Sequence, residues 1–159
     1  MQDPQEQQVS RRRYSEQKRG AQAWENIRVI KDLDKQSADK KLEKEYRSLA
    51  RGLNAMIQIN GLGQTLGFLK AKGKQQEGKP HYQLLLHLTT WMQDDEHFHA
   101  ANSDVMRRGY DGLLQWVLDI DTSSDDYRRA TTECLAFGVW LRRFAEAELK
   151  EPEVGENIE

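Results

Sequence analysis

Apolar residues recur every three or four positions along a central stretch of the chain, which is the spacing of one face of an α-helix. This pattern predicts a helix over about 38–59. Asn60 and Gly61 follow it, and both residue types tolerate the left-handed backbone conformation that ends a helix. A second, short amphipathic segment starts at Leu62 and stops at Gly73. The apolar face of the first helix comprises Leu42, Tyr46, Leu49, Leu53, Met56 and Ile57.

Two further helices follow from the same spacing. One covers about 14–33 and turns Trp24 and Ile27 towards the core. The other covers about 80–93 and begins with a proline, which suits the first turn because its missing amide would be unpaired there. It is apolar nearly all round, and this is typical of a helix at the centre of a bundle.

The last third of the chain predicts two more helices. A fifth is capped by Asn102 or Ser103 and ends near residue 119. The last begins at Ser123, with Asp126 three residues later in a capping-box type of start, and runs to about Leu149.

These elements predict an all-α fold, a compact bundle of about five to six helices. Leu, Ala, Glu, Gln, Lys and Arg dominate, and no alternating β-branched segment is present. We expect a single helical domain over 14–149, preceded by a mobile polar tail over 1–13 and followed by a disordered acidic tail over 150–159. A chain of 159 residues is long enough to bury a core without a metal or a disulfide.

Charge is unevenly distributed along the chain, although the net charge is −2. Residues 1–74 carry 16 Lys and Arg against 9 Asp and Glu, whereas residues 75–159 carry 8 against 17. Such asymmetry suggests a basic face for a polyanion, or head-to-tail contacts between copies. Helical bundles also expose charge for solubility alone, and that explanation stays open.

The cysteine content and the absence of targeting signals predict a cytoplasmic protein without membrane contact. Cys134 is the sole cysteine, so no internal disulfide is possible, and neither a signal peptide nor a long apolar run is present. Cys134 falls on the apolar face of the last helix, where a buried, unreactive thiol is expected.

Two glycine motifs resemble nucleotide-binding sequences without meeting their requirements. Residues 73–79 have the spacing of a phosphate-binding loop, but Pro80 stands where a magnesium-binding hydroxyl is needed, and a helix precedes the loop in place of a strand. Residues 61–67 lack the glycine spacing and the strand of a dinucleotide fingerprint. We expect Gly61 and Gly63 to allow the helix break and a close approach of backbones.

No catalytic residue, metal site or cofactor is predicted. His97 and His99 offer zinc-ligand types without further partners, so a solvated loop is favoured. Residues 119–130 place acidic groups at alternate positions, as calcium loops do, but Ser124 and Ala130 replace the required glycine and glutamate. No nucleophile and base share a recognisable local setting.

Several ordered blocks resemble the small subunit of type III-B CRISPR effector complexes, the Cmr family. The resemblance spans roughly residues 17–147. Its blocks are Gln17-Lys-Arg-Gly-Ala-Gln-Ala23, Tyr46-Arg-Ser-Leu-Ala-Arg51, Ile57-Gln-Ile-Asn-Gly-Leu-Gly-Gln-Thr-Leu-Gly-Phe-Leu-Lys-Ala-Lys-Gly73, Tyr127-Arg-Arg-Ala-Thr-Thr-Glu-Cys-Leu-Ala136 and Trp140-Leu-Arg-Arg-Phe-Ala-Glu-Ala147.

The resemblance implies an all-helical, non-catalytic subunit that stacks with copies of itself as a short inner filament. Its implied partners are guide RNA, target RNA, and the backbone and large subunits of the complex. A basic face would follow the guide–target duplex by charge alone, because base pairing supplies the sequence specificity. The residues we expect to contact RNA are Arg47, Arg51, Lys70, Lys72, Lys74, Arg128, Arg142 and Arg143.

Two alternatives remain at this point. Arg47 and Arg51 are equally suited to pairing with Glu43 and Glu45 or to lying along the core edge. As a function, the first alternative is a helical protein–protein adaptor whose basic residues contact acidic partners, and an enzyme is the third possibility.

Overall fold

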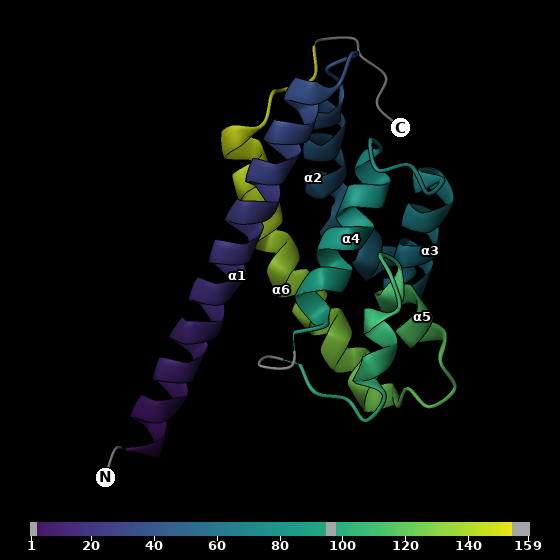
Figure 1. Ribbon diagram of the computed structural model, residues 1–159. Helices are drawn as coiled ribbons and strands as arrows, with labels where there is room; N and C mark the ends of the chain where they lie inside the picture. Colours follow the sequence, from purple (N-terminus) through teal and green to yellow (C-terminus); the bar gives the residue numbers. More distant parts are fainter. Residues whose placement is uncertain (1–2, 95–97, 154–159) are drawn as a thin grey trace.

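Helices account for nearly all regular structure in residues 3–94 and 98–153, the part of the chain that this computed structural model describes (Figure 1). No β-strand occurs among these residues, which confirms the all-α prediction. The elements are α1 (Pro4–Gln36), α2 (Leu42–Asn60), α3 (Leu62–Gly73), α4 (Pro80–Met92), the short 3₁₀-helix η1 (Ser103–Arg107), α5 (Gly112–Leu118) and α6 (Ser124–Glu148).

The two longest helices, α1 and α6, pack side by side at one edge of the bundle, and α2 packs on α6 (Figure 1). On its other side α2 contacts α3 and α4, which pack on each other, and η1 and α5 complete that half. Glu133 of α6 joins three helices, because its carboxylate accepts hydrogen bonds from Arg19 of α1 at 2.7 and 3.1 Å and from Trp91 of α4 at 3.2 Å.

The predicted apolar face of α2 is largely confirmed. Leu42, Tyr46, Leu53 and Ile57 are buried, whereas Leu49 and Met56 at the edge of the same face are half-buried. The helix ends where expected, because Gly61 adopts a φ of +85° and its N–H donates to the Ile57 carbonyl.

Helix α1 begins earlier than the sequence pattern indicated. The predicted start at Tyr14 is wrong, because residues 4–13, where a mobile tail was expected, are helical. Asp3 caps this helix by accepting from the Gln5 N–H at 3.0 Å, and Pro4 occupies its first turn. Both are helix-start signals, and they act here without apolar periodicity.

The inward face of α1 also differs in one residue. Ile27 is buried as predicted, but Trp24 is 45% exposed and lies edge-on against Phe144 of α6, with ring centroids 5.2 Å apart. Ala23 and Ile30 are also buried, and α1 packs on α2 and α6.

The predicted fifth helix over 103–119 is two elements, η1 and α5. Gly109 adopts a φ of +137° between them, and such a backbone cannot continue an α-helix. The apolar pattern still describes burial correctly, since Met106, Leu113 and Leu114 are buried.

The predicted helices α4 and α6 match the structure. Leu84, Leu85, Leu88, Trp91 and Met92 make α4 buried around most of its surface. In α6 the side chain of Ser123 caps the helix by accepting from the Asp126 N–H at 3.1 Å, and Cys134 is buried. The predicted disordered tail falls mainly on residues 154–159, which lie outside the described residues.

Candidate nucleic-acid interface

Two arginines expected to contact RNA are brought together across the junction of α2 and α6. The guanidinium of Arg51 lies 3.3 Å from the Glu146 carboxylate, and Arg142 donates to the same oxygen at 3.0 Å. Arg143, the next residue on α6, is exposed. One carboxylate therefore holds two guanidinium groups at the surface, with a net positive charge.

Arg47, one turn before Arg51, is in a different environment. The residue is only 8% exposed, and a guanidinium nitrogen donates to Glu151 at 3.2 Å. The Arg47 Nε has no hydrogen-bond partner among the described residues. Arg47 is therefore paired with a glutamate, as the alternative anticipated, but the glutamate lies in the segment after α6 and is neither Glu43 nor Glu45.

Lys70 is likewise engaged within the fold. Its ammonium pairs with the carboxylate of Asp111, a residue that is itself buried. Burial opposes ionisation of this carboxyl group, but hydrogen bonds from Lys70 and Gln115 outweigh it and hold the pKa of Asp111 below its ordinary value. Lys70 thus contributes to the attachment of α5 to α3.

Lys72 and Lys74 lie at the C-terminal end of α3, where they complement the negative end of the helix dipole. Both are exposed. In residues 3–94 and 98–153 neither of them, nor Arg143, forms an ion pair with another side chain. These three cations are available to a ligand without breaking a contact.

Arg128 is separated from the other candidates. It sits in the first turns of α6 and pairs with Asp125 at 2.6 Å. Arg142 follows 14 positions later on the same helix, which corresponds to about 21 Å at 1.5 Å per residue. Arg128 therefore lies several helical turns away from the arginines at the junction of α2 and α6.

Helix α2 lies between the remaining cations, since it packs on α6 on one side and on α3 and α4 on the other. The arginines of α6 and the lysines of α3 therefore belong to helices that both pack on α2. We use the name α2 surface for Arg51, Lys72, Lys74, Arg142 and Arg143.

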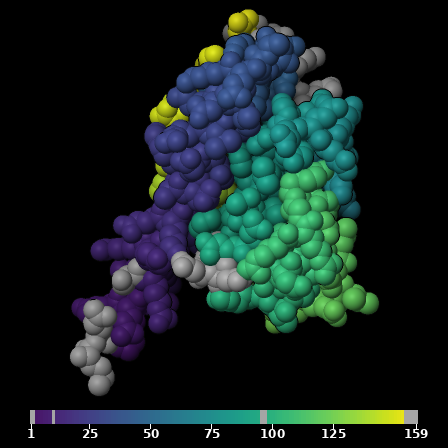
Figure 2. Space-filling view, viewed as in Figure 1, coloured from purple at the N-terminus to yellow at the C-terminus, as the bar shows by residue number. Residues whose placement is uncertain are grey.

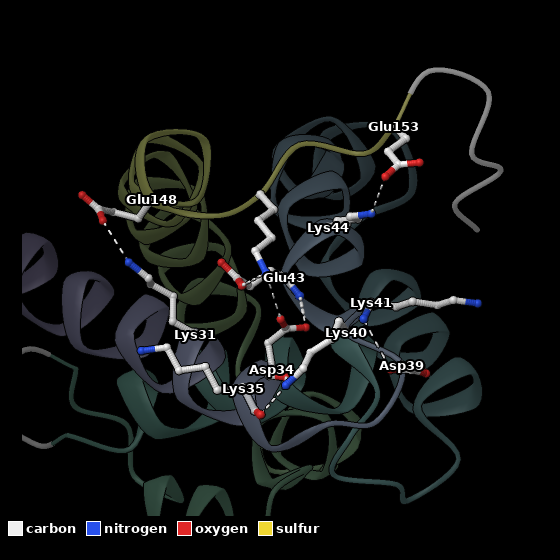
Figure 3. Close-up of polar contacts among 11 residues, drawn as sticks. Lys31, Asp34, Lys35, Asp39, Lys40, Lys41, Glu43, Lys44, Glu148 and Glu153 are labelled. Atoms are coloured by element: carbon white, nitrogen blue, oxygen red, sulfur yellow. Dashed lines mark hydrogen bonds and ion pairs between the residues drawn. The ribbon is translucent and has the colours of Figure 1, made fainter.

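The segment after α6 makes a polar junction that sequence reasoning missed (Figure 3). Lys150 lies 3.8 Å from Asp34 and 3.6 Å from Glu43, and Glu153 lies 3.7 Å from Lys44. Burial and the neighbouring Asp34 carboxyl raise the pKa of Glu43. Because these contacts join the end of α1, the start of α2 and the last described residues, the junction supports the fold.

An apolar groove of about 730 Å³ lies between α6 and the N-terminal half of α1. The first part of α1 extends away from the rest of the molecule (Figure 2). Trp140 and Phe144 form the floor of the groove on α6, and Val9 contributes from α1. Arg12 and Arg13 stand beside these apolar groups. The groove has the character of a protein-binding surface, in which an apolar centre is bordered by charge.

The described residues offer no metal site. They contain no group of three His, Cys, Asp or Glu side chains placed to hold a metal ion, and His97 lies outside them. Burial raises the pKa of the Cys134 thiol, which disfavours the reactive thiolate. Within the same ranges no helix combines the length and apolar character needed to span a bilayer.

A comparison with protein families identifies the chain. The family model of the CRISPR-associated protein (Cas_Cmr5) matches residues 15–148, which is most of the sequence and includes every cation of the α2 surface. The match also covers every block on which the resemblance to the Cmr small subunit rests. The chain therefore belongs to the Cas_Cmr5 family, whose members are subunits of the type III-B Cmr complex.

Proposed function

We propose that this chain is a non-catalytic small subunit that binds the backbone of guide–target RNA through the α2 surface and stacks with copies of itself beside the backbone and large subunits. Cleavage would belong to other subunits, and the location would be the cytoplasm. The observation that carries this proposal is the placement of exposed cations from α2, α3 and α6 on both sides of one helix.

The chemistry of the α2 surface supports backbone binding. Arginine and lysine contact phosphates without reading bases, and a complex that recognises its target through a guide needs no base readout from this subunit. Arg142 and Arg51 remain partly neutralised by Glu146. Lys72, Lys74 and Arg143 are therefore the residues we expect to contribute most.

Stacking is supported by two surfaces of complementary character. The groove carries aromatic side chains beside Arg12 and Arg13. The last residue of α5, Leu118, is 74% exposed, and Ile120 in the loop that follows is 97% exposed; an acidic residue follows each of them. Insertion of this loop into the groove of the next copy would be a heterologous contact, which propagates into a filament.

The test of RNA binding is a salt series on the assembled complex with single-stranded RNA and with a guide–target duplex. Replacing Lys72, Lys74 and Arg143 with alanine should weaken binding to unrelated sequences alike. It should also flatten the dependence of log K on log salt by up to about one unit for each lost phosphate contact.

A matched control removes three exposed cations outside this surface, Arg28, Lys35 and Arg108. Its salt slope should stay close to that of the unmodified chain. Arg47 and Lys70 are left in place, because truncating either would strip a partner from a contact inside the fold. Equal slopes for both triple variants, each folded by circular dichroism, would refute RNA contact by the α2 surface.

The adaptor alternative retains a specific observation in its favour, the apolar groove. An adaptor contact centred on Trp140 and Phe144 should weaken little between about 50 and 200 mM salt, whereas a phosphate contact falls steeply. The same salt series therefore separates the two functions.

A further inference from the structure

Three cations of α2 form a row along one face of the helix. Lys44, Arg47 and Arg51 are three and four positions apart, which is the spacing of neighbours on a helix surface. Each cation is paired with a glutamate from the last part of the chain. The nitrogen–oxygen distances are 3.7 Å from Lys44 to Glu153, 3.2 Å from Arg47 to Glu151 and 3.3 Å from Arg51 to Glu146. We use the name cation row for Lys44, Arg47 and Arg51.

The glutamates meet the cation row in reverse order, because the chain runs back along α2 after α6. Glu146 belongs to the last turn of α6, and the other two glutamates lie in residues 149–153, which we call the C-terminal strap. The strap is anchored where it begins, since Leu149 is buried and the Lys150 ammonium lies 3.6 Å from the Glu43 carboxylate. In Figure 3 the strap crosses the start of α2, and the Glu153 side chain points to Lys44.

The two glutamates of the strap are the outer members of their ion pairs. The side chains of Glu151 and Glu153 are 78% and 79% exposed, whereas those of Arg47 and Lys44 are 9% and 19% exposed. Residues 150–153 have no regular secondary structure. Ion pairs with such an exposed partner contribute little to stability and are screened by salt. The two carboxylates can therefore leave the row while Leu149 and Lys150 stay in place.

The chemistry of the cation row suits a phosphate backbone better than a protein partner. Between Lys44 and Gln58, all of which the structure describes, no large apolar side chain is highly exposed, so the row lacks the apolar centre of a protein interface. Guanidinium and ammonium groups accept carboxylates and phosphates as partners alike. Arg51 belongs to both the row and the α2 surface, so an RNA strand on that surface reaches the row without a gap.

The other carboxylates near the start of α2 do not repel a phosphate from the cation row. Glu43 and Asp34 are buried and face the Lys150 ammonium. Glu45 faces away from the row, because it lines a cavity with Phe68 of α3 and His81 of α4. The negative groups that lie on the row itself are thus Glu146 and the glutamates of the strap.

We propose that the cation row is a second contact for the RNA backbone, and that the C-terminal strap occupies it until RNA displaces the strap. The inference rests on the proposed RNA-binding function and concerns its regulation by residues beyond the family match, which ends at residue 148. In the free chain the carboxylates of Glu151 and Glu153 stand in the place of phosphates. A strand that contacts several cations at once exchanges both carboxylates for phosphates, whereas a small anion that meets one cation does not compete.

The first test measures binding of a single-stranded oligouridylate to the complete chain. Replacing Glu151 and Glu153 with glutamine removes the competing charges and leaves the anchor intact. Affinity should rise about fivefold at about 50 mM salt, because two exposed ion pairs no longer have to be broken. The gain should shrink towards about 200 mM, because salt also weakens these ion pairs in the unmodified chain.

A matched control removes two other exposed carboxylates, with Glu25→Gln and Asp104→Asn. This variant has the same net charge as the strap variant, and neither position forms an ion pair with α2 in the described part of the chain. Its affinity should stay close to that of the unmodified chain. An equal gain in both variants, each folded by circular dichroism, would show that overall charge and not the strap limits binding.

The second test observes the strap directly by NMR of the complete chain. Oligouridylate should move the amide resonances of Glu151 and Glu153 towards those of an unstructured peptide, while the resonance of buried Leu149 changes little. Polyglutamate is the comparison probe, because it carries carboxylates in place of phosphates. Displacement of the strap by polyglutamate as readily as by oligouridylate would overturn RNA as the occupant in favour of an acidic protein.

The outcomes separate the strap from the proposed function. RNA binding that depends on Lys72, Lys74 and Arg143, with equal affinities for the unmodified chain and the strap variant, would overturn the strap and leave the function. Tighter binding by the strap variant, with no contribution from those three cations, would keep the cation row and refute the α2 surface. If neither chain binds oligouridylate at about 50 mM salt, the row is overturned whatever the assembled complex binds.

Discussion

A buried pair of titratable side chains, Tyr46 and His87, lies at the centre of the bundle. The Tyr46 hydroxyl is 2.7 Å from His87 Nδ1, and both residues are buried. Burial lowers the pKa of His87 to about 3 and raises the pKa of Tyr46. The imidazole is therefore neutral in the folded chain throughout the physiological range.

This environment predicts that the chain loses stability as pH falls below about 6.5. An unfolded chain protonates His87 near its ordinary pKa of about 6.5, whereas the folded chain does not until about pH 3. Between these values the unfolded state binds more protons, so the free energy of unfolding decreases with falling pH. The decrease should approach about 1.4 kcal/mol per pH unit, measured by urea unfolding at pH 7, 6 and 5.

The controls for this prediction are two single histidine variants. His87→Gln should be less stable at pH 7, because it disturbs the contact with Tyr46, but should show a shallower decline to pH 5. His99→Gln, at an exposed position, should keep the original slope. Parallel slopes in all three chains would show that His87 does not cause the decline.

Leu53 tests the predicted core face of α2. The residue is fully buried, so Leu53→Ala should lower the free energy of unfolding by about 2 to 5 kcal/mol. Met56→Ala, on the same predicted face but half-buried, should cost less. Chemical denaturation gives both values, and equal losses would contradict the observed difference in burial.

Two helical glycines, Gly138 of α6 and Gly52 of α2, make opposite predictions for the stability of the fold. A Cβ on Gly138 of α6 would overlap the side-chain amide of Asn54, which donates to the Leu135 carbonyl at 3.0 Å. Gly138→Ala should therefore lower the unfolding free energy by about 1 to 3 kcal/mol, because this hydrogen bond breaks or the helices separate. Gly52→Ala should raise it by up to about 1 kcal/mol. Thermal melts of the two variants should shift in opposite directions, and a common sign would contradict this account.

A helix can be predicted from sequence when its apolar face and its ends are set by residues close together in the chain. The core face of α2, the break at Gly61 and the cap at Ser123 are set by residues close in sequence, and all three can be predicted. The start of α1 escapes prediction because residues 4–13 have no apolar face, and only their cap and proline mark a helix. The division between η1 and α5 depends on Gly109, whose positive φ is one of several conformations that a glycine allows.

At the scale of the molecule, the basic first half and acidic second half of the chain predict a head-to-tail association between copies. Replacing Leu118 and Ile120 with serine should reduce self-association in sedimentation velocity, because it removes the exposed apolar groups from the acidic loop. Trp140→Ala should have the same effect from the groove side, whereas Ile59→Ser, at another exposed apolar position, should not. Unchanged association in the loop variant would exclude this loop as the stacking contact.

Much less of the candidate site than of the fold follows from sequence. Basic residues can be recognised by type, but their use depends on partners that are distant along the chain. Arg47 pairs with Glu151, 104 residues away, and Lys70 with Asp111, 41 residues away. No local pattern distinguishes these engaged cations from Lys72 or Arg143. The C-terminal strap escapes prediction for the same reason, since Lys44 and Glu153 are also far apart along the chain.

The packing of α1 on α6 also determines when the apolar face of α1 can be covered during protein synthesis. The contacts of Arg19 with Glu133 and of Lys31 with Glu148 join residues 114 and 117 positions apart. Ribosomes add about 5 to 20 residues per second, so α1 emerges roughly 5 to 25 s before its main partner. During that interval Ala23, Ile27 and Ile30 lack the surface that later covers them, and nascent chains stalled before α6 should depend on chaperones to stay unaggregated.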